Sequence, residues 1–167
     1  MIAFVIPAHN EERLIGRTLQ SIHAAARAAG RPYQIVVADD GSTDRTAEIG
    51  REHGARVVSI QSRHIAAARN TGARAALENS DCRVLIFLDA DTILPEATLR
   101  AALDALEGGA IGGGGAVQFD GPVPRWASVM MSIFLIVFRW MRWSGGCFVF
   151  CRREAFEAAG GWNEGVF

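Results

Sequence analysis

Short apolar runs alternate with longer amphipathic stretches through the first two thirds of the chain. The runs lack the alternation of a half-exposed strand, and such runs are typical of strands buried on both faces of a parallel sheet. They predict four strands, at Ile2–Ile6, Gln34–Ala38, Ala55–Ile60 and Arg83–Leu88. The stretches between and after them predict four helices, near Glu11–Ala29, Thr43–His53, Ile65–Glu78 and Pro95–Leu106.

Local signals within the helical stretches support these assignments. The first stretch carries one apolar stripe at helical spacing, formed by Leu14, Thr18, Leu19, Ile22 and Ala26. Ser42 or Thr43 is expected to cap the second helix, with Asp44 in its first turn, and Pro95 suits the first position of the fourth. Because repeated strand–helix units imply a parallel sheet with right-handed crossovers, we expect a doubly wound α/β domain.

The character of the chain changes after Leu106. Gly112–Gly115 is expected to be flexible or tightly packed backbone, and Ala116–Phe119 is predicted to be a strand. The largely apolar part of Trp126–Trp143 is shorter than the roughly 20 residues that a bilayer span needs. We interpret this segment as a core helix. An interfacial helix with a rim of Trp and Arg is the alternative.

Length and composition narrow the class of protein. A chain of 167 residues, 50% hydrophobic and with a net charge of −1, suits one soluble domain and lacks the basic excess of a nucleic-acid binder. The cysteines, Cys82, Cys147 and Cys151, form no zinc pattern and are expected to be reduced, the last two as core residues. The chain starts with an apolar strand and lacks a secretory signal, so we expect a cytoplasmic protein. An interfacial Trp126–Trp143 would bind it peripherally to the inner face of the plasma membrane.

Polar and acidic residues directly follow three of the predicted strands. They form the segments Pro7–Glu12, Asp39–Asp44 and Asp89-Ala90-Asp91. The carboxyl ends of parallel strands open on one edge of a sheet, where such folds bind ligands, so these groups are expected to converge. In an ideal strand Asp89 and Asp91 would leave the same face, and Mg²⁺ or Mn²⁺ shared with substrate phosphates would relieve their repulsion. A solvated turn is the alternative.

Single residues in these segments suggest binding roles, each with a simpler alternative. Asp39 offers a fixed acceptor for a nucleobase N–H; a turn with a helix cap is the alternative interpretation of Asp39–Asp44. His9 is interpreted as a polar loop residue more readily than as a ligand or base. Arg69 can pair with a phosphate or lie on a solvated helix face. The chain has no Gly-x-Gly-x-x-Gly after its first strand and no Walker-type motif, which argues against a dinucleotide dehydrogenase and a P-loop enzyme.

The order and spacing of several motifs resemble the family 2 glycosyltransferases, which have the GT-A fold. The motifs cover nearly the whole chain, at Val5–Glu12, Ile35–Thr46, Ala67–Gly72, Phe87–Asp91, Arg152–Phe156 and Gly160–Glu164. The resemblance implies transfer of a sugar from a nucleoside diphosphate sugar to a glycan, lipid or small-molecule acceptor, usually with inversion. It also implies one domain over residues 1–167, in which 1–106 bind the donor and 107–167 begin the acceptor side.

The resemblance further implies the roles of individual residues. Asp39 matches the position that binds the nucleobase, and Pro7–Glu11 lines the nucleoside pocket. Asp89-Ala90-Asp91 matches the DxD motif, whose first Asp lies near the ribose and whose last Asp is the metal ligand. The metal, Mg²⁺ or Mn²⁺, stabilises charge on the leaving nucleotide. The donor-binding residues are then Pro7, Ala8, His9, Glu11, Asp39, Arg69, Asp89, Ala90 and Asp91.

One departure from the family concerns the general base. The family's base is a carboxylate beyond the segment that Gly160–Glu164 matches, and the chain ends at Phe167. We therefore expect a C-terminally incomplete GT-A domain whose base lies beyond Phe167, and whose exposed apolar edges favour a homo-oligomer. The alternatives are a donor-binding module without turnover, a membrane-surface assembly protein acting through Trp126–Trp143, and a nucleotidyltransferase that would release pyrophosphate.

Overall fold

The computed structural model describes residues 1–115, 124, 130 and 146–165. The predicted strand Ala116–Phe119 lies outside these residues, as does the predicted helix Trp126–Trp143 except for Met130. Within the described part of the chain, no helix is both long and apolar enough to cross a membrane.

Six strands form one mixed sheet in the order β3-β2-β1-β4-β6-β5. The first four run parallel and confirm the four predicted strands. Their bounds are β1 Ile2–Ala8, β2 Tyr33–Asp40, β3 Arg56–Ile60 and β4 Val84–Leu88. Two further strands extend the sheet through antiparallel pairs, β6 (Phe148–Arg152) beside β4 and β5 (Gly112–Gly114) beside β6.

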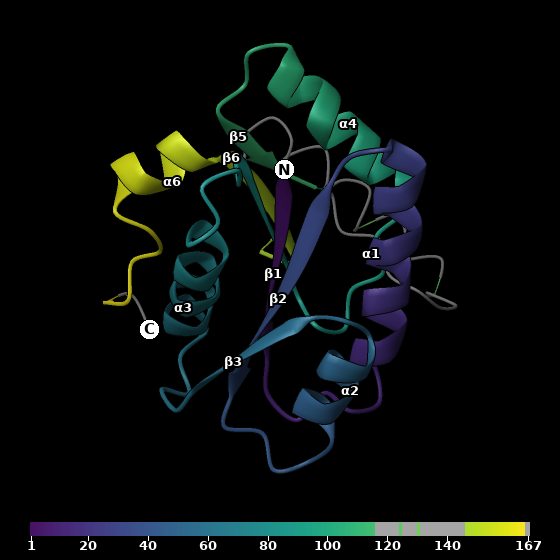
Figure 1. Ribbon diagram of the computed structural model, residues 1–167, viewed down its shortest axis with the longest axis vertical. Coiled ribbons are helices and arrows are strands. Elements are labelled where there is room, and N and C mark those ends of the chain that lie inside the picture. The colour runs from purple at the N-terminus through teal and green to yellow at the C-terminus, as the bar shows by residue number, and fades with distance from the viewer. Residues whose placement is uncertain (116–123, 125–129, 131–145, 166–167) are drawn as a thin grey trace.

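Helices cover both faces of the sheet, which confirms the doubly wound arrangement. Figure 1 shows α1, α2 and α4 on one side of the strands, with α3 and α6 on the other. The helices are α1 Ile15–Ala29, α2 Thr46–Glu52, α3 Ile65–Leu77, α4 Glu96–Glu107 and α6 Arg153–Ala159.

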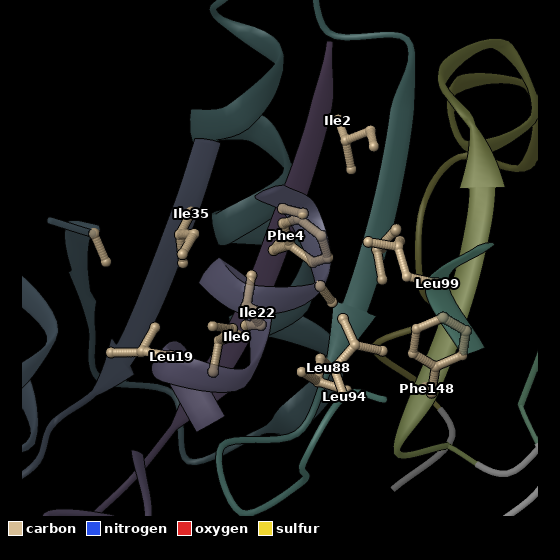
Figure 2. Packing of buried hydrophobic residues seen from close by; sticks show 14 of the residues in the cluster. Ile2, Phe4, Ile6, Leu19, Ile22, Ile35, Leu88, Leu94, Leu99 and Phe148 are labelled. Carbon is tan, nitrogen blue, oxygen red and sulfur yellow. The ribbon is translucent and has the colours of Figure 1, made fainter. Parts of the chain in front are cut away.

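Alternate residues of the central strands bury into two separate cores. Phe4 and Ile6 of β1 belong to the core under α1 and α4, where Figure 2 shows them beside Leu19 and Ile22. Val5, the residue between them, belongs to the core under α3. Because both faces of these strands are covered, both sets of residues are apolar, which explains the continuous runs in the sequence.

The helix starts differ from the prediction by a few residues. α1 begins at Ile15 and not at Glu11, because residues 11–14 form a turn in which the Leu14 N–H donates to the Glu11 carbonyl at 3.0 Å. Leu14, the first residue of the predicted stripe, is 39% exposed. The sequence predicts Pro95 at the first helical position of α4, but Pro95 is the N-cap residue, one position earlier, with an extended ψ of 143°.

Neither residue predicted to cap α2 does so. Arg45 occupies the N-cap position, and Asp44 lies before the helix, where its Oδ1 accepts the Thr46 N–H at 2.9 Å. Ser42 instead accepts the backbone N–H of Asn10 at 2.9 Å. The polar residues after β2 therefore tie two loops together.

Glycines of the segment Gly112–Gly115 are tightly packed, as one of the two interpretations of this segment predicts. A Cβ at Gly112 would lie 2.7 Å from the Phe150 carbonyl oxygen, and one at Gly113 would lie 2.8 Å from the Phe150 ring. Only glycine lets β5 approach β6 this closely. In the same region Cys147 and Cys151 are partly buried, whereas Cys82 is fully buried, and all three are free thiols.

Candidate functional site

A cavity of about 390 Å³ opens at the carboxyl ends of the four parallel strands. The loops after β1, β3 and β4 contribute to its wall, together with Asp40, the last residue of β2. The wall consists of Pro7, Ala8, His9, Glu11, Asp40, Arg63, His64, Ile65, Ala68, Asp89, Ala90 and Asp91. Seven of the nine predicted donor-binding residues are in this set, and Asp39 and Arg69 are not.

Hydrogen bonds hold the loop after β1 against the loop after β2. The Asn10 side chain accepts the backbone N–H of Thr43 at 2.8 Å, and the Asn10 N–H donates to Ser42. The Glu11 N–H donates to the Thr46 hydroxyl at 2.7 Å. These bonds fix the rim of the cavity that carries His9 and Glu11.

The partners of His9 define which of its ring nitrogens carries the proton. Its Nδ1 lies 2.7 Å from the backbone oxygen of Asp40, which can only accept, so Nδ1 is the donor. Its Nε2 lies 3.3 Å from the side-chain nitrogen of Asn10 and accepts from it. The imidazole therefore links the loop after β1 to the carboxyl end of β2 within the cavity wall.

Asp40, which the sequence did not single out, lines the cavity and organises the loop after β3. Its carboxylate accepts the backbone N–H groups of Ser62 at 2.7 Å, Arg63 at 3.0 Å and His64 at 3.0 Å, and also the Ser62 hydroxyl. Burial raises the pKa of Asp40, but the hydrogen bonds outweigh it and hold this pKa below its ordinary value.

Asp39 lies outside the cavity wall, whereas the next residue of β2, Asp40, lines it. It is 6% exposed, and its Oδ1 is buried without a hydrogen-bond partner. Such an oxygen can accept one more donor. The predicted contact of Asp39 with a nucleobase stays a prediction.

Asp89 and Arg69 form an ion pair at one end of the cavity. The Arg69 Nη2 donates to Asp89 Oδ1 at 2.8 Å and to the Gly146 carbonyl at 2.7 Å. The Arg69 side chain is 7% exposed, and its Cζ lies 4.5 Å from the centroid of the Trp162 ring. Arg69 is therefore buried, and the alternative of a solvated helix face is wrong.

Asp91, in contrast, is exposed at the cavity wall. Among the described residues it has no ion-pair partner, and its nearest polar contact is the Thr92 hydroxyl at 3.4 Å. Burial raises the pKa of Glu11 across the cavity, and the charges of Asp91 and Asp44 raise it further. This acidic end would attract a cation.

The acidic end does not form a complete metal site by itself. In residues 1–115, 124, 130 and 146–165 no three His, Cys, Asp or Glu side chains are grouped to hold an ion. One or two carboxylates do suffice for Mg²⁺ when substrate phosphates supply further oxygens. The unpaired Asp91 fits that arrangement better than Asp89, whose carboxylate is held by Arg69.

Asn70 joins the segment after α6 to the same end of the molecule. Its side chain accepts the Trp162 N–H at 2.8 Å and donates to the Trp162 carbonyl at 2.9 Å and the Glu164 carboxylate at 2.7 Å. Neighbouring residues of α3, Arg69 and Asn70, therefore fix both Asp89 and Trp162. Both sides of this contact lie in segments that resemble family motifs, Ala67–Gly72 and Gly160–Glu164, but the sequence alone did not pair the two segments.

Arg63 and His64 also line the cavity, and the sequence did not single them out. They lie in the loop after β3, just as the other site segments lie at or after the ends of their strands. The general rule that ligands bind at the carboxyl ends of parallel strands could have identified them.

The sequence is similar to a known protein family and to individual members of it. A model of glycosyl transferase family 2 matches residues 3–160. An undecaprenyl-phosphate 4-deoxy-4-formamido-L-arabinose transferase of Pseudomonas aeruginosa is 31% identical over 143 residues, which are 80% of this chain and 41% of that protein. The chain thus spans less than half the length of this relative.

Solved structures confirm the fold. The mannosyltransferase PcManGT from Pyrobaculum calidifontis, in complex with GDP-Man and Mn²⁺, superposes with a TM-score of 0.76 at 24% identity, covering 99% of this chain and 48% of that one. Glucosyl-3-phosphoglycerate synthase from Mycobacterium tuberculosis, with Mn²⁺, UDP and glucosyl-3-phosphoglycerate, gives 0.63 at 21% identity, covering 92% and 57%. Both have the GT-A fold that the sequence motifs predict.

Proposed function

The chain belongs to glycosyl transferase family 2, and on that premise we propose that its cavity binds a nucleoside diphosphate sugar whose sugar is transferred to an acceptor. The observation that carries this proposal is the cavity itself. It brings together the carboxyl end of β2 and the loops after β1, β3 and β4, with the unpaired Asp91 at its acidic end.

We propose that Asp91 holds Mg²⁺ or Mn²⁺ together with the diphosphate of the donor. Both solved neighbours described above carry Mn²⁺, which supports a divalent cation. The bound ion would neutralise negative charge on the departing nucleoside diphosphate. Asp89 does not bind the ion in this scheme, because it already pairs with Arg69. Through Arg69, which also donates to the Gly146 carbonyl, it links the end of β4 to the backbone at Gly146.

The nucleoside is proposed to lie along Pro7, Ala8 and His9, toward the loop after β2. This orientation follows from the metal position, because the diphosphate anchors the donor near the end of β4. At the β2 end Asp40 faces the cavity with its carboxylate fully used by backbone donors, whereas Asp39 keeps one unpartnered oxygen. A contact between the base and Asp39 would use that oxygen.

We propose a lipid phosphate as the acceptor, with inversion of the anomeric centre. The name of the Pseudomonas relative gives undecaprenyl phosphate, which supports this class. A phosphate monoester has a second pKa near 6 and carries a charge of about −1.5 to −2 at pH 7. Its oxygen is therefore already deprotonated and can attack without a general base. The proposal therefore needs no base among the described residues, although an alcohol acceptor would need one.

The location and assembly of the protein remain proposals of the same kind. A lipid acceptor would place the protein on the cytoplasmic side of the plasma membrane, in peripheral contact through Trp126–Trp143. Self-association would cover apolar edges of the sheet. Flotation with vesicles and light scattering of the purified protein would test the two proposals separately.

A thermal-shift panel tests donor binding directly. UDP, GDP and dTDP are each added with and without Mn²⁺, and one of them is expected to stabilise the protein selectively and only with the ion. A ligand at a hundredfold excess over its Kd adds about 2.7 kcal/mol to the free energy of unfolding. Failure of every nucleoside diphosphate to stabilise the protein would contradict the proposal. Stabilisation without transfer to polyprenyl phosphate would indicate a donor-binding module.

A further inference from the structure

We propose that Arg63 reads the nucleobase of the donor and favours uracil, thymine and guanine, which carry a carbonyl oxygen at O4 or O6, over cytosine and adenine, which carry an amino group at that position. The inference rests on the proposed function, since it concerns the same cavity. It assigns a specificity-determining role to a residue that lies outside the family motifs of the sequence.

The order of the strands places Arg63 at the nucleoside end of the cavity. β3 and β4 lie at opposite ends of the parallel part of the sheet, β3-β2-β1-β4. Asp91 follows β4 and Arg63 follows β3, and both line the same cavity. A donor whose diphosphate lies at Asp91 therefore extends its nucleoside toward β2 and Arg63.

The backbone of Arg63 is held in a conformation that its side chain disfavours. Its φ is 51°, in the left-handed region that glycine adopts without cost. The Asp40 carboxylate maintains this conformation by accepting the N–H groups of Ser62, Arg63 and His64. A strained residue in a cavity wall, fixed by a neighbouring carboxylate, is the arrangement found at ligand sites.

The guanidinium of Arg63 is available to a ligand. No Asp or Glu in the described part of the chain pairs with it, whereas Arg45 pairs with Glu48 and Arg69 with Asp89. The cavity is otherwise acidic, with Glu11, Asp89 and Asp91 in its wall. A nucleoside diphosphate carries no carboxylate. The hydrogen-bond acceptors that it can offer to Arg63 are therefore those of its base and its phosphates.

The chemistry of arginine explains the preference for bases that carry a carbonyl oxygen at O4 or O6. A guanidinium only donates hydrogen bonds, and its planar fork matches two adjacent acceptors such as O6 and N7 of guanine. The O4 atom of uracil and thymine is likewise an acceptor. Cytosine and adenine carry an amino group at the equivalent position, which would set donor against donor.

Calorimetric titration of the 167-residue chain with Mn²⁺ present tests the inference. UDP is compared with CDP, and GDP with ADP. The base that the wild type prefers should bind at least about tenfold more tightly than its amino counterpart, since a hydrogen bond from a charged group such as the guanidinium contributes roughly one to two decades of affinity. Arg63→Ala should remove most of that ratio by weakening the preferred nucleotide.

Two further variants separate recognition from structure. Arg63→Gly keeps the backbone donor to Asp40 and suits a positive φ, so it should lose the same ratio without lowering the Tm. Arg100→Ala removes an exposed arginine of α4 outside the cavity wall and should leave all affinities unchanged.

The outcomes distinguish the inference from the function on which it rests. Absence of binding by all four nucleotides would overturn the proposed function. Binding without a preference within either pair, or a preference that survives both Arg63 variants, would overturn the inference and leave donor binding intact. Loss of the preference in Arg63→Gly at an undiminished Tm would support it.

Discussion

Asp89 and Asp91 should respond in opposite ways to the same substitution, although only one residue separates them. Asp89→Asn removes the charge that faces the buried Arg69 guanidinium, whose Nη2 donates to Asp89 at 2.8 Å. Asp91→Asn removes an exposed charge with no ion-pair partner among the described residues. We expect the first change to cost stability and the second to cost metal-dependent donor binding.

The burial of the ion pair sets the size of the effect. Removing one partner of a fully buried pair costs roughly 3–5 kcal/mol, and losing a hydrogen bond to a charged group costs about 1.5–3 kcal/mol. The Arg69 side chain is 7% exposed but that of Asp89 is 29% exposed, so solvent screens the pair. The new Asn also keeps one acceptor oxygen. We therefore expect Asp89→Asn to destabilise the fold by about 1.5–3 kcal/mol and Asp91→Asn by less than about 0.5 kcal/mol.

Urea denaturation followed by circular dichroism measures this difference, with the midpoint compared at constant m value. Arg69→Leu serves as the matched variant, because a double-mutant cycle with Asp89→Asn isolates the coupling between the two side chains. Calorimetry with Mn²⁺ and the nucleoside diphosphate that the thermal-shift panel selects completes the test. Equal destabilisation by the two Asp variants, or a coupling energy near zero, would refute the division of roles.

Three further predictions concern packing, pH and the joint between α3 and the segment after α6. Gly72→Ala should lower the free energy of unfolding by about 1–3 kcal/mol, because a Cβ there would lie 2.5 Å from a side chain of β1. Gly16→Ala is the control: a Cβ there would lie 3.4 Å from its nearest neighbour, so this change should be neutral or stabilising. Equal effects of the two changes in thermal unfolding would contradict this packing. The depressed pKa of Asp40 contributes stability that is present above the ordinary Asp pKa of about 3.9 and is lost as the pH falls through the lower folded-state pKa. Urea midpoints should be measured from about pH 5 down to about pH 2, the range in which carboxylates titrate. They should fall more steeply with pH for the wild type than for Asp40→Asn, and parallel curves would contradict this role of Asp40. Asn70→Ala removes both hydrogen bonds to the Trp162 backbone, so amide exchange at Trp162 should accelerate, and unchanged exchange would show that Asn70 is not the joint.

The central fold could be predicted because its strands are buried on both faces and its helices follow at regular intervals. The run Val84–Leu88 is apolar throughout, and the structure uses both of its faces. β5 could not be predicted in this way, because Gly112–Gly114 has the lowest strand propensity and pairs only because its missing side chains admit Phe150. Its place in the sheet depends on a partner strand that is distant in sequence.

The candidate site could be located from the sequence, but the roles of its residues could not all be assigned. The convergence of the segments at Pro7–Glu12 and Asp89–Asp91 follows from the parallel topology alone. The choice between Asp39 and Asp40 depends on how the loop after β3 packs at the end of β2, since the Asp40 carboxylate accepts the backbone N–H groups of Ser62, Arg63 and His64. Burial of Arg69 depends on Trp162 and Gly146, which only the tertiary structure brings to α3.

The position of the cation in a crystal of the protein with Mn²⁺ and its preferred nucleoside diphosphate tests the proposed site most directly. Anomalous scattering would locate the ion without reference to the protein atoms. The ion is expected beside the Asp91 carboxylate and the diphosphate, in the cavity at the carboxyl ends of β1 to β4, while Asp89 stays paired with Arg69. An ion bound at Asp89 with Arg69 displaced, or a nucleotide bound outside this cavity, would contradict the proposal.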